Sequence, residues 1–214
     1  MAATSVLAPA GLRRRAVAHL RAADPVLAAV IDRVGPCRWV VHDGVEPFAA
    51  LASSIVYQQI SGKAAASIYA RVAALGGGGR LRPAHVAAAS DEALRACGLS
   101  RQKTAYLRDL AAHAVGGKSL AGLARLDDDT VIERLTVVKG VGRWTAEMFL
   151  MFRLGRTDVL PVDDYGIRKA MQRAYRMRAL PKPDRMRRVA EAWRPYRTVA
   201  CWYLWRSLGG AAGG

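Results

Sequence analysis

The chain has 214 residues, which is enough for one domain or for two small domains that share a core. Lys and Arg number 33 against 17 Asp and Glu, a formal net charge of +16. A chain this basic usually meets a polyanion, most often nucleic acid, although the abundance of Arg and Ala leaves open that genome composition supplies part of the excess.

Three cysteines and four histidines are scattered without the spacing of a disulfide framework or a zinc site, which indicates a reducing compartment. No apolar run reaches the length of a membrane span, and the first ten residues lack the charged start of a signal peptide. We therefore expect a cytoplasmic protein, or a nuclear one if the source is a eukaryote.

Helix signals recur along the chain, whereas strand patterns are nearly absent. Residues 1–9 look loose, and residues 37–45 form a loop or a short extended piece. In the first half we predict helices over residues 10–22, 25–35, 47–57, 63–75 and 101–115, with short ones starting at Pro83 and Ser90. Asp24-Pro25 is a cap followed by proline at the first helical position, and Ser61 and Ser100 are further caps. Glycines at 76–79 and 116–117 break the pattern.

Cations stand at the starts of two of these helices. Arg101 and Lys103 lie in a first turn, where positive charge opposes the helix dipole, so stability alone would not select them. Contact with a phosphate would explain them, and a solvated surface explains them equally. Lys63 begins another helix and has the same two interpretations.

Residues 130–153 read as two helices, 130–136 and 143–153, around Gly140-Val141-Gly142. Glycine accepts positive φ at little cost, so such a turn reverses the chain tightly. It also leaves backbone N–H groups bare at the start of the second helix, which is a ready site for an anion such as a DNA phosphate. The segment is therefore predicted to be a helix-hairpin-helix element. The three aspartates at 127–129 lie at the start of the first of these helices, where the dipole favours negative charge, and are interpreted as structural.

Two aspartates follow Pro161, and we predict Asp163 as a helix N-cap with Asp164 in the first turn, where the dipole favours its ionised form. An ionised carboxylate there can stabilise a developing positive charge or orient a water; alternatively, both aspartates merely cap the helix. An Arg-rich helix follows from Asp164, then one over residues 183–193 and a last one to about Leu208. Residues 209–214 are predicted to be a disordered tail.

Several of these motifs together resemble the helix-hairpin-helix DNA glycosylases, and most closely their DNA-3-methyladenine glycosylase II (alkylbase glycosylase) branch. The resemblance covers roughly residues 24–208. It rests on the hairpin with Trp144-Thr145-Ala146, the Pro-x-Asp-Asp-Tyr block ending at Tyr165, residues 55–63, and Trp193-Arg-Pro-Tyr-Arg197 followed by Trp205. The chain is too short for the extra N-terminal β-rich domain of the larger bacterial members, which implies a compact form.

The resemblance implies an all-α fold of two helical subdomains with a DNA-binding cleft between them. Residues 47–161 would form the subdomain that contains the hairpin. Residues 1–46 would pack with the C-terminal helices of residues 162–208, which carry the catalytic aspartate.

The resemblance also assigns roles to individual residues. Asp164 would be catalytic. The base pocket would comprise Trp144, Trp205, Tyr165, Tyr57 and Met148. Gln59, with Ile60, would be the wedge that fills the hole left by the flipped base, although the glutamines at 58 and 59 could equally tie their turn to neighbouring backbone. Phosphate contacts would come from Gly140, Val141, Gly142, Arg143, Thr145, Lys139, Lys63 and Lys103. The carbonyls of Thr136, Val138 and Val141 would hold a Na⁺ or K⁺ ion.

The implied function is base excision repair by a monofunctional DNA glycosylase. Bifunctional relatives carry a nucleophilic lysine two residues after the second hairpin glycine, and this chain has Trp144 there. The enzyme would flip alkylated bases of the 3-methyladenine and 7-methylguanine type out of double-stranded DNA and leave an abasic site. It would act as a monomer, with no required cofactor, zinc or iron–sulfur cluster. The alternatives are a glycosylase for other lesions, such as ethenoadenine or hypoxanthine, and a non-catalytic DNA-binding module.

Overall fold

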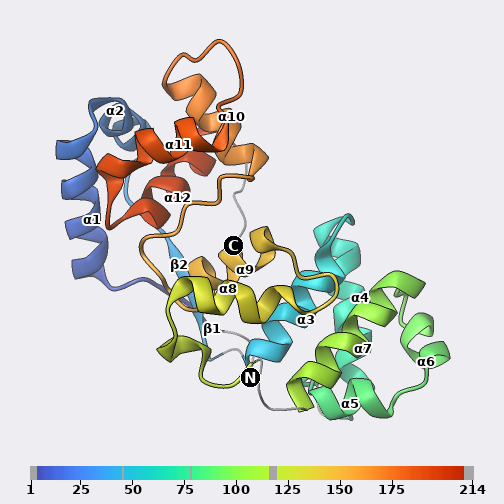
Figure 1. Ribbon diagram of the computed structural model, residues 1–214. Helices are drawn as coiled ribbons and strands as arrows, with labels where there is room; N and C mark the ends of the chain where they lie inside the picture. Colours follow the sequence, from blue (N-terminus) through green and yellow to red (C-terminus); the bar gives the residue numbers. More distant parts are fainter. Residues whose placement is uncertain (1–3, 45, 78, 116–119, 210–214) are drawn as a thin grey trace. The chain divides into compact units, whose positions relative to one another are not determined.

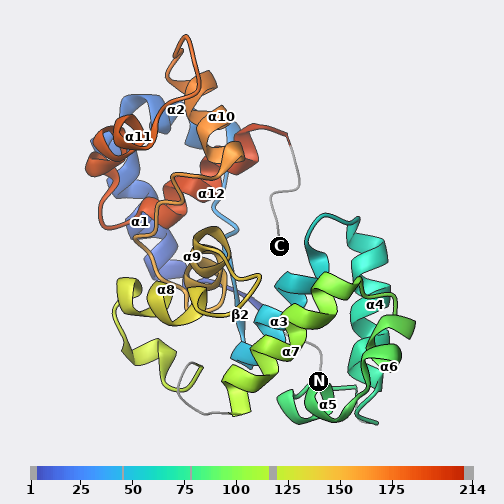
Figure 2. The same ribbon diagram turned by 45° about the vertical axis from the view of Figure 1, so that its right-hand side comes forward.

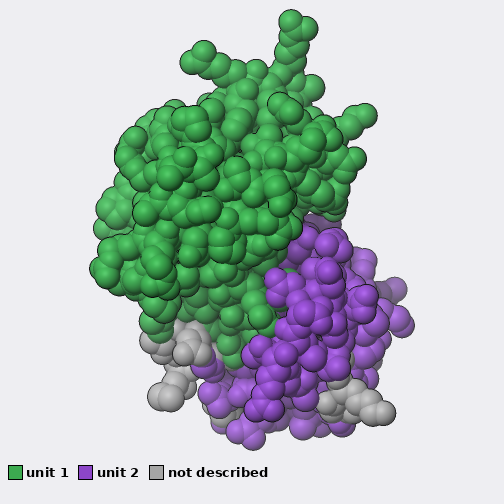
Figure 3. All heavy atoms as spheres, turned by 60° about the vertical axis from the view of Figure 1, so that its left-hand side comes forward, with its two compact units in different colours: residues 1–43, 150–214 green, residues 44–149 purple. Residues whose placement is uncertain are grey.

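The computed structural model describes residues 4–44, 46–77, 79–115 and 120–209. It is mostly helical, as the sequence predicts, with twelve α-helices in the described residues. The chain divides into two compact units, which Figure 3 shows in different colours. Unit 1 comprises residues 1–43 and 150–214, and unit 2 comprises residues 44–149.

Unit 1 contains the helices from the N-terminal and C-terminal parts of the chain (Figure 1). They are α1 (Ala10–Ala23), α2 (Pro25–Val34), α10 (Tyr165–Ala174), α11 (Pro183–Ala190), the 3-10 turn η2 (Glu191–Trp193) and α12 (Arg197–Ser207). Helix α12 is buried from Thr198 to Leu204 and packs against α1, α2 and α10, so it is the centre of this unit.

A small antiparallel sheet also belongs to unit 1. Strand β1 (Thr4–Leu7) pairs with β2 (Val40–Asp43) in a register that places Leu7 opposite Val40. The expectation that residues 1–9 are loose is therefore wrong for residues 4–7, while residues 1–3 lie outside the described residues. The strand was not apparent in the sequence because its hydrogen-bonding partner lies more than thirty residues away, and a four-residue strand gives little local signal.

Asp24 joins several elements of unit 1. It is 8% exposed and caps α2, with Oδ1 accepting from the N–H groups of Val26 (2.9 Å) and Leu27 (3.0 Å). Its other oxygen accepts from Trp193 Nε1 (2.8 Å) and from the Tyr175 hydroxyl (2.5 Å). Burial, and then this carboxylate, raise the pKa of Tyr175. One predicted helix cap thus also holds the end of α10 and η2 in place.

Unit 2 contains the middle helices of the chain. They are α3 (Pro47–Tyr57), α4 (Gly62–Ala74), α5 (Pro83–Ala88), α6 (Asp91–Ala96), α7 (Arg101–Val115), the 3-10 turn η1 (Leu123–Arg125), α8 (Asp128–Thr136) and α9 (Arg143–Phe152), whose last residues belong to unit 1. Helix α7 packs against α3, α5 and α6, and buried leucines fill the core. Figure 2 shows α3 and α7 side by side.

The predicted helix starts of unit 2 are confirmed to within two residues, with α8 beginning at Asp128 instead of residue 130. Ser61, Ser90 and Asp127 cap α4, α6 and α8 with their side chains, and the Ser100 hydroxyl accepts from the N–H of Lys103 (3.2 Å). Hydrogen bonds from Thr130 lower the pKa of Asp127. Of the predicted glycine breaks, Gly78 and residues 116–117 lie outside the described residues, as does the tail from residue 210.

All three cysteines are buried and carry free thiols: Cys37, Cys97 and Cys201. Burial raises the pKa of the Cys37 thiol. Across the residues that the structure describes, no helix is long and apolar enough to cross a membrane. Within the same residues, no three His, Cys, Asp or Glu side chains are grouped to hold a metal ion.

Candidate active site

Asp164 is itself the N-cap of α10, so the prediction that Asp163 occupies that position is wrong by one residue. The reason is a turn in which the N–H of Asp164 bonds to the carbonyl of Pro161 at 3.1 Å, so Asp163 falls inside the turn. The Asp164 side chain accepts from the N–H of Ile167 at 2.7 Å. The carboxylate therefore sits at the positive end of the helix dipole, which stabilises its charge.

Trp205 reaches Asp164 from α12. Its indole Nε1 donates to Oδ1 of Asp164 at 2.9 Å, and its ring lies 6.0 Å from that of Phe152, centroid to centroid. Gly166 makes this approach feasible, because a Cβ there would lie 3.0 Å from Oδ1 of Asp164 and 3.1 Å from the indole ring. Both Asp164 and Trp205 are half-buried. The structure thus brings together a carboxylate and an aromatic ring that the sequence predicts as site residues.

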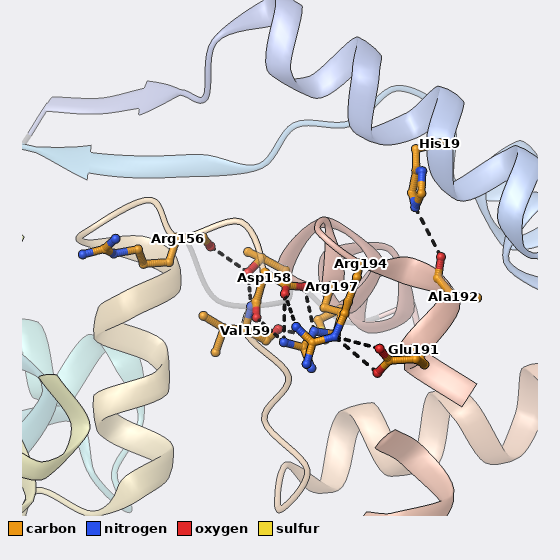
Figure 4. A network of polar contacts seen from close by, with 10 residues as sticks. His19, Arg156, Asp158, Val159, Glu191, Ala192, Arg194 and Arg197 are labelled. Carbon is orange, nitrogen blue, oxygen red and sulfur yellow. Dashed lines mark hydrogen bonds and ion pairs between the residues drawn. The ribbon is translucent and has the colours of Figure 1, made fainter. Parts of the chain in front are cut away.

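A network of ion pairs fixes the segment that leads to Asp164 (Figure 4). Arg197, at the start of α12, binds Asp158 through Nε at 2.6 Å and Nη2 at 2.9 Å, and Arg194 adds a contact at 2.8 Å. Thr198 bonds to the carbonyl of Arg156 (2.7 Å) and receives the N–H of Val159 (3.0 Å). Bidentate Arg–carboxylate pairs are directional, so residues 156–159 are tied to the helix that carries Trp205.

The predicted hairpin is present in unit 2 between α8 and α9. Gly140 has φ +83°, and a Cβ there would lie 2.2 Å from the ring of Tyr106, so glycine is required. At Gly142 a Cβ would meet nothing within 4 Å. The N–H of Val141 bonds to the carbonyl of Val138 at 3.0 Å, and Asp109 accepts the N–H of Lys139 at 2.8 Å. The turn is thus rigid at Gly140 and open at Gly142, where α9 begins.

Gln58 connects the predicted wedge turn to this hairpin. Its Nε2 donates to the carbonyl of Gly140 at 2.9 Å, so this glutamine ties its turn to neighbouring backbone. Gln59 is exposed and has φ +56°, an uncommon conformation for a residue with a side chain. Ile60 is 39% exposed. The turn therefore projects Gln59 and Ile60 from a fixed base.

Lys103, one of the predicted phosphate contacts, makes hydrogen bonds inside unit 2. Its ammonium donates to the carbonyls of Val56 and Gln58, both at 2.6 Å, and burial lowers its pKa. Carbonyls at the end of a helix lack intrahelical partners and attract cations. Lys103 thus caps the end of α3, which explains a cation in the first turn of α7 without DNA.

The remaining predicted residues divide between the two units. In unit 1, Tyr165 is 64% exposed. In unit 2, Trp144 (48%), Tyr57 (42%), Lys63 and Lys139 are exposed, and Met148 is half-buried. Arg143 pairs with the buried Glu147 at 3.1 Å. Thr145 is also buried, in the first turn of α9. Asp109 and Asp158 were not predicted to support the site, whereas the contact of Gln58 with neighbouring backbone was one of the two interpretations of that residue.

Comparison with known proteins identifies the family. Residues 52–195 match the model of the HhH-GPD superfamily base excision DNA repair proteins. The chain belongs to this superfamily, in its DNA-3-methyladenine glycosylase branch. It is 36% identical to DNA-3-methyladenine glycosylase 1 of Schizosaccharomyces pombe over 165 residues, which is 76% of this chain and 72% of the relative.

Two solved structures of this branch resemble the chain along most of its length. A DNA-3-methyladenine glycosidase from Bacillus halodurans has a TM-score of 0.81 and 41% identity, covering 92% of this chain and 90% of its own. The S. pombe 3-methyladenine DNA glycosylase Mag1, in complex with abasic DNA, has a TM-score of 0.78 and 32% identity, covering 94% and 99%. The predicted glycosylase branch is therefore confirmed.

Some of the residues that hold the candidate site of this HhH-GPD protein in place stand in recognisable sequence motifs. Arg194 and Arg197 stand in the Trp193–Arg197 segment that carries the family resemblance, and their partner Asp158 is half-buried. Gly166 lies two residues after Asp164, in the first turn of α10, where a glycine suggests a close neighbour. Nothing in the sequence points to Asp109 as the acceptor for the hairpin.

Proposed function

We propose that the chain is a 3-methyladenine DNA glycosylase of base excision repair, which hydrolyses the N-glycosidic bond of alkylated bases in double-stranded DNA. Membership of the DNA-3-methyladenine glycosylase branch supports the reaction. The observation that carries the proposal is Asp164, a carboxylate fixed at a helix N-terminus by two donors and next to an indole ring.

The proposed reaction needs little acid catalysis, because alkylation at adenine N3 or guanine N7 already places positive charge on the base. As the bond from the sugar C1′ to the base nitrogen breaks, its electron pair moves to the base and neutralises that charge. Positive charge then develops on the sugar, where Asp164 would stabilise it electrostatically. A water oxygen bonds to C1′, and its proton is released to solvent or to the carboxylate.

Aromatic rings would hold the cationic base before cleavage. A cation over the face of Trp or Tyr gains roughly 0.5–2 kcal/mol. Trp205 and Tyr165 in unit 1, and Trp144, Tyr57 and Met148 in unit 2, are the proposed pocket residues. Without a lysine at position 144, we propose that the enzyme does not cut the strand after removing the base.

The hairpin is the proposed contact to the DNA backbone. The open approach at Gly142 and the first-turn N–H groups of α9 suit a phosphate oxygen. Lys139 and Arg143 are exposed beside the hairpin in the sequence, Lys63 is exposed at the start of α4, and all three would add charge. Gln59 with Ile60 is the proposed wedge. The carbonyls of Thr136, Val138 and Val141 are hard oxygen donors of the kind that suit Na⁺ or K⁺, which would help to neutralise the phosphate.

The test measures release of 3-methyladenine and 7-methylguanine from methylated duplex DNA by wild type and by Asp164→Asn. The amide oxygen of Asn can still accept from Ile167 and Trp205, so this variant should fold and bind DNA normally. We expect base release to fall by roughly 10²–10³, the usual cost of losing one preorganised electrostatic contact. A melting curve and a DNA-binding isotherm control for folding and affinity.

The other outcomes have definite meanings. Equal release by both proteins would show that Asp164 is not the catalytic carboxylate. No release by wild type, with tight binding to DNA that weakens in salt, would indicate a different lesion or a non-catalytic binding protein. Trapping of a protein–DNA adduct by borohydride would contradict the monofunctional mechanism.

A further inference from the structure

A dense group of cations lies at the far end of α10, in the following loop and on α11. Residues 173–188 carry seven cations and one carboxylate, Asp184, a net charge of +6 out of the +16 of the whole chain. We call this group the α10–α11 basic surface. Its exposed cations are Arg173, Arg176, Arg178, Lys182, Arg185, Arg187 and Arg188. Figures 1 and 2 both show the connecting loop standing out from the helices of unit 1.

An open hollow of about 450 Å³ lies in this surface. Met177, Ala179 and Pro181 supply apolar lining, while Lys182, Arg185 and Arg188 supply charge. Asp184 also lines the hollow, but its carboxylate pairs with Arg187 at 2.7 Å. The hollow is therefore cationic with an apolar wall.

Several of these cations occupy positions where helix stability alone disfavours them. Arg176 follows Tyr175, the C-cap of α10, and has φ +50°, a conformation usually found for Gly or Asn just after a helix C-terminus. Lys182 is the N-cap of α11 and makes no capping hydrogen bond with its side chain. Arg185 lies in the first turn of α11, where positive charge opposes the dipole. Random enrichment in arginine does not explain why cations replace the residues that these positions favour.

The backbone under the charges is held in place. Arg168 Nε donates to the carbonyl of Pro181 at 3.1 Å, and Gln172 Nε2 contacts the carbonyl of Arg178 at 3.5 Å. On the other face of α11, Met186 and Ala190 are buried. The cations are thus presented by an ordered loop and helix, which lowers the entropy cost of binding a ligand.

We propose that the α10–α11 basic surface binds the phosphodiester backbone of double-stranded DNA, as a second phosphate-binding surface besides the hairpin. Six of its seven cations are arginines, whose planar guanidinium groups bind phosphate oxygens in pairs. The apolar wall suits the deoxyribose beside a phosphate. Such a surface reads no bases, so it would retain the protein on undamaged DNA. The choice of DNA as the nucleic acid rests on the proposed function.

The test compares two double variants that remove equal charge from unit 1. Arg185→Gln with Arg188→Gln changes the surface, and Arg14→Gln with Arg15→Gln removes two exposed cations from α1 as the control. Binding to a short undamaged duplex is measured by fluorescence anisotropy between about 50 and 200 mM salt. For the surface variant, we expect the slope of log K against log salt to become shallower by about 2, since each neutralised phosphate contributes about 0.9. The control slope should stay at the wild-type value.

The activity assay separates this proposal from the proposed function. Single-turnover base release by the wild-type protein from methylated duplex DNA is measured beside the binding titrations, because it reports the proposed function alone. If wild type releases no methylated base but the slope still changes as expected, the proposed function fails and the surface stands. If base release is observed but the slope does not change, the surface proposal fails alone.

Two further outcomes would overturn the proposal. Equal slope changes in both double variants would mean that only overall charge matters. Loss of binding to phosphatidylglycerol vesicles or to polyglutamate, with the duplex slope unchanged, would assign the surface to a membrane or an acidic protein. Thermal melting of each variant confirms that the chain remains folded.

Discussion

The two donors to Asp164 come from different parts of unit 1. One is the N–H of Ile167 in its own helix, and the other is the indole of Trp205 on α12. The first fixes the carboxylate at the helix start, and the second orients it against a ring. This arrangement tolerates no side chain at Gly166, since a Cβ would meet both Asp164 and Trp205.

We predict that Gly166→Ala lowers base release about tenfold or more while thermal stability is little changed. Alanine favours a helix over glycine by up to about 1 kcal/mol, which offsets part of the clash. The added methyl should displace Trp205 or Asp164 by a few tenths of an ångström or more. Single-turnover base release and a melting curve provide the two measurements.

Gly11→Ala is the matched control, because Gly11 is also the second residue of its helix and lies in the same unit. A Cβ there meets only the flexible end of Arg15, at 3.5 Å. It should leave base release unchanged. Full activity in Gly166→Ala would show that the close approach of Trp205 is not needed.

Two lysines at helix starts, alike in sequence, differ in the structure. Lys103 donates to two carbonyls at the end of α3, whereas Lys63 is exposed at the start of α4. We predict that Lys103→Met lowers the free energy of unfolding by about 1–3 kcal/mol, the cost of losing hydrogen bonds to a charged group. Its effect on the salt slope of DNA binding should be small.

Lys63→Met should give the opposite result, with unchanged stability and a salt slope shallower by about 1. Urea unfolding and anisotropy titrations measure the two quantities. A change of salt slope in Lys103→Met, with stability intact, would restore the phosphate contact predicted from the sequence.

At the scale of elements, the sequence predicts helices well because their start signals are local. Proline at the first helical position and Ser or Asp caps mark most starts, and the structure confirms Asp24, Ser61 and Ser90 in that role. Asp127, one of three aspartates expected at a helix start, proves to be the cap of α8. The error at Asp163 arose within one turn, where the hydrogen bond to the Pro161 carbonyl moved the helix start by one residue. Capping residues therefore predict the start of a helix to within one turn. The residue at which the helix begins depends on the hydrogen bond that closes the preceding turn.

Contacts between elements could not be predicted in the same way. Asp158 finds Arg194 and Arg197 across 36 and 39 residues, and Asp24 finds Tyr175 and Trp193 across 151 and 169. Many other acids and bases in this chain were equally plausible partners. The β1–β2 pairing has the same character. Of the site residues, Asp164 and Trp205 were recognisable from family motifs, but their mutual hydrogen bond and the supports around them were not.

For the whole molecule, we predict a loss of stability in alkali. Burial first, and then nearby Cys37, raise the pKa of Tyr203 from 10.0 to about 12, and its hydroxyl donates to the carbonyl of Gly35 at 3.1 Å. Because the pKa is raised in the folded state, the contribution of protonated Tyr203 to the free energy of unfolding is complete below about pH 10. This contribution is lost as the pH rises towards 12. The loss is on the order of 2–3 kcal/mol for this group, at 1.36 kcal/mol per pKa unit.

Urea unfolding between about pH 8 and pH 11.5 measures this loss. Tyr203→Phe should be less stable than wild type by about 1 kcal/mol near pH 8, from its lost hydrogen bond, and should decline less steeply in alkali. Tyr175, whose pKa is also raised, should cause part of the loss of stability in alkali in both proteins. The same slope in both would contradict the role of Tyr203.

The burial of Cys37, Cys97 and Cys201 has a practical consequence for the wedge turn. Reaction with a thiol reagent needs an accessible thiolate, so the native chain should be inert to maleimide. A single cysteine introduced at Gln59, which is exposed, would then be the preferred point of labelling. A fluorophore there would report whether the turn enters the DNA stack, without first having to strip the protein of its own thiols.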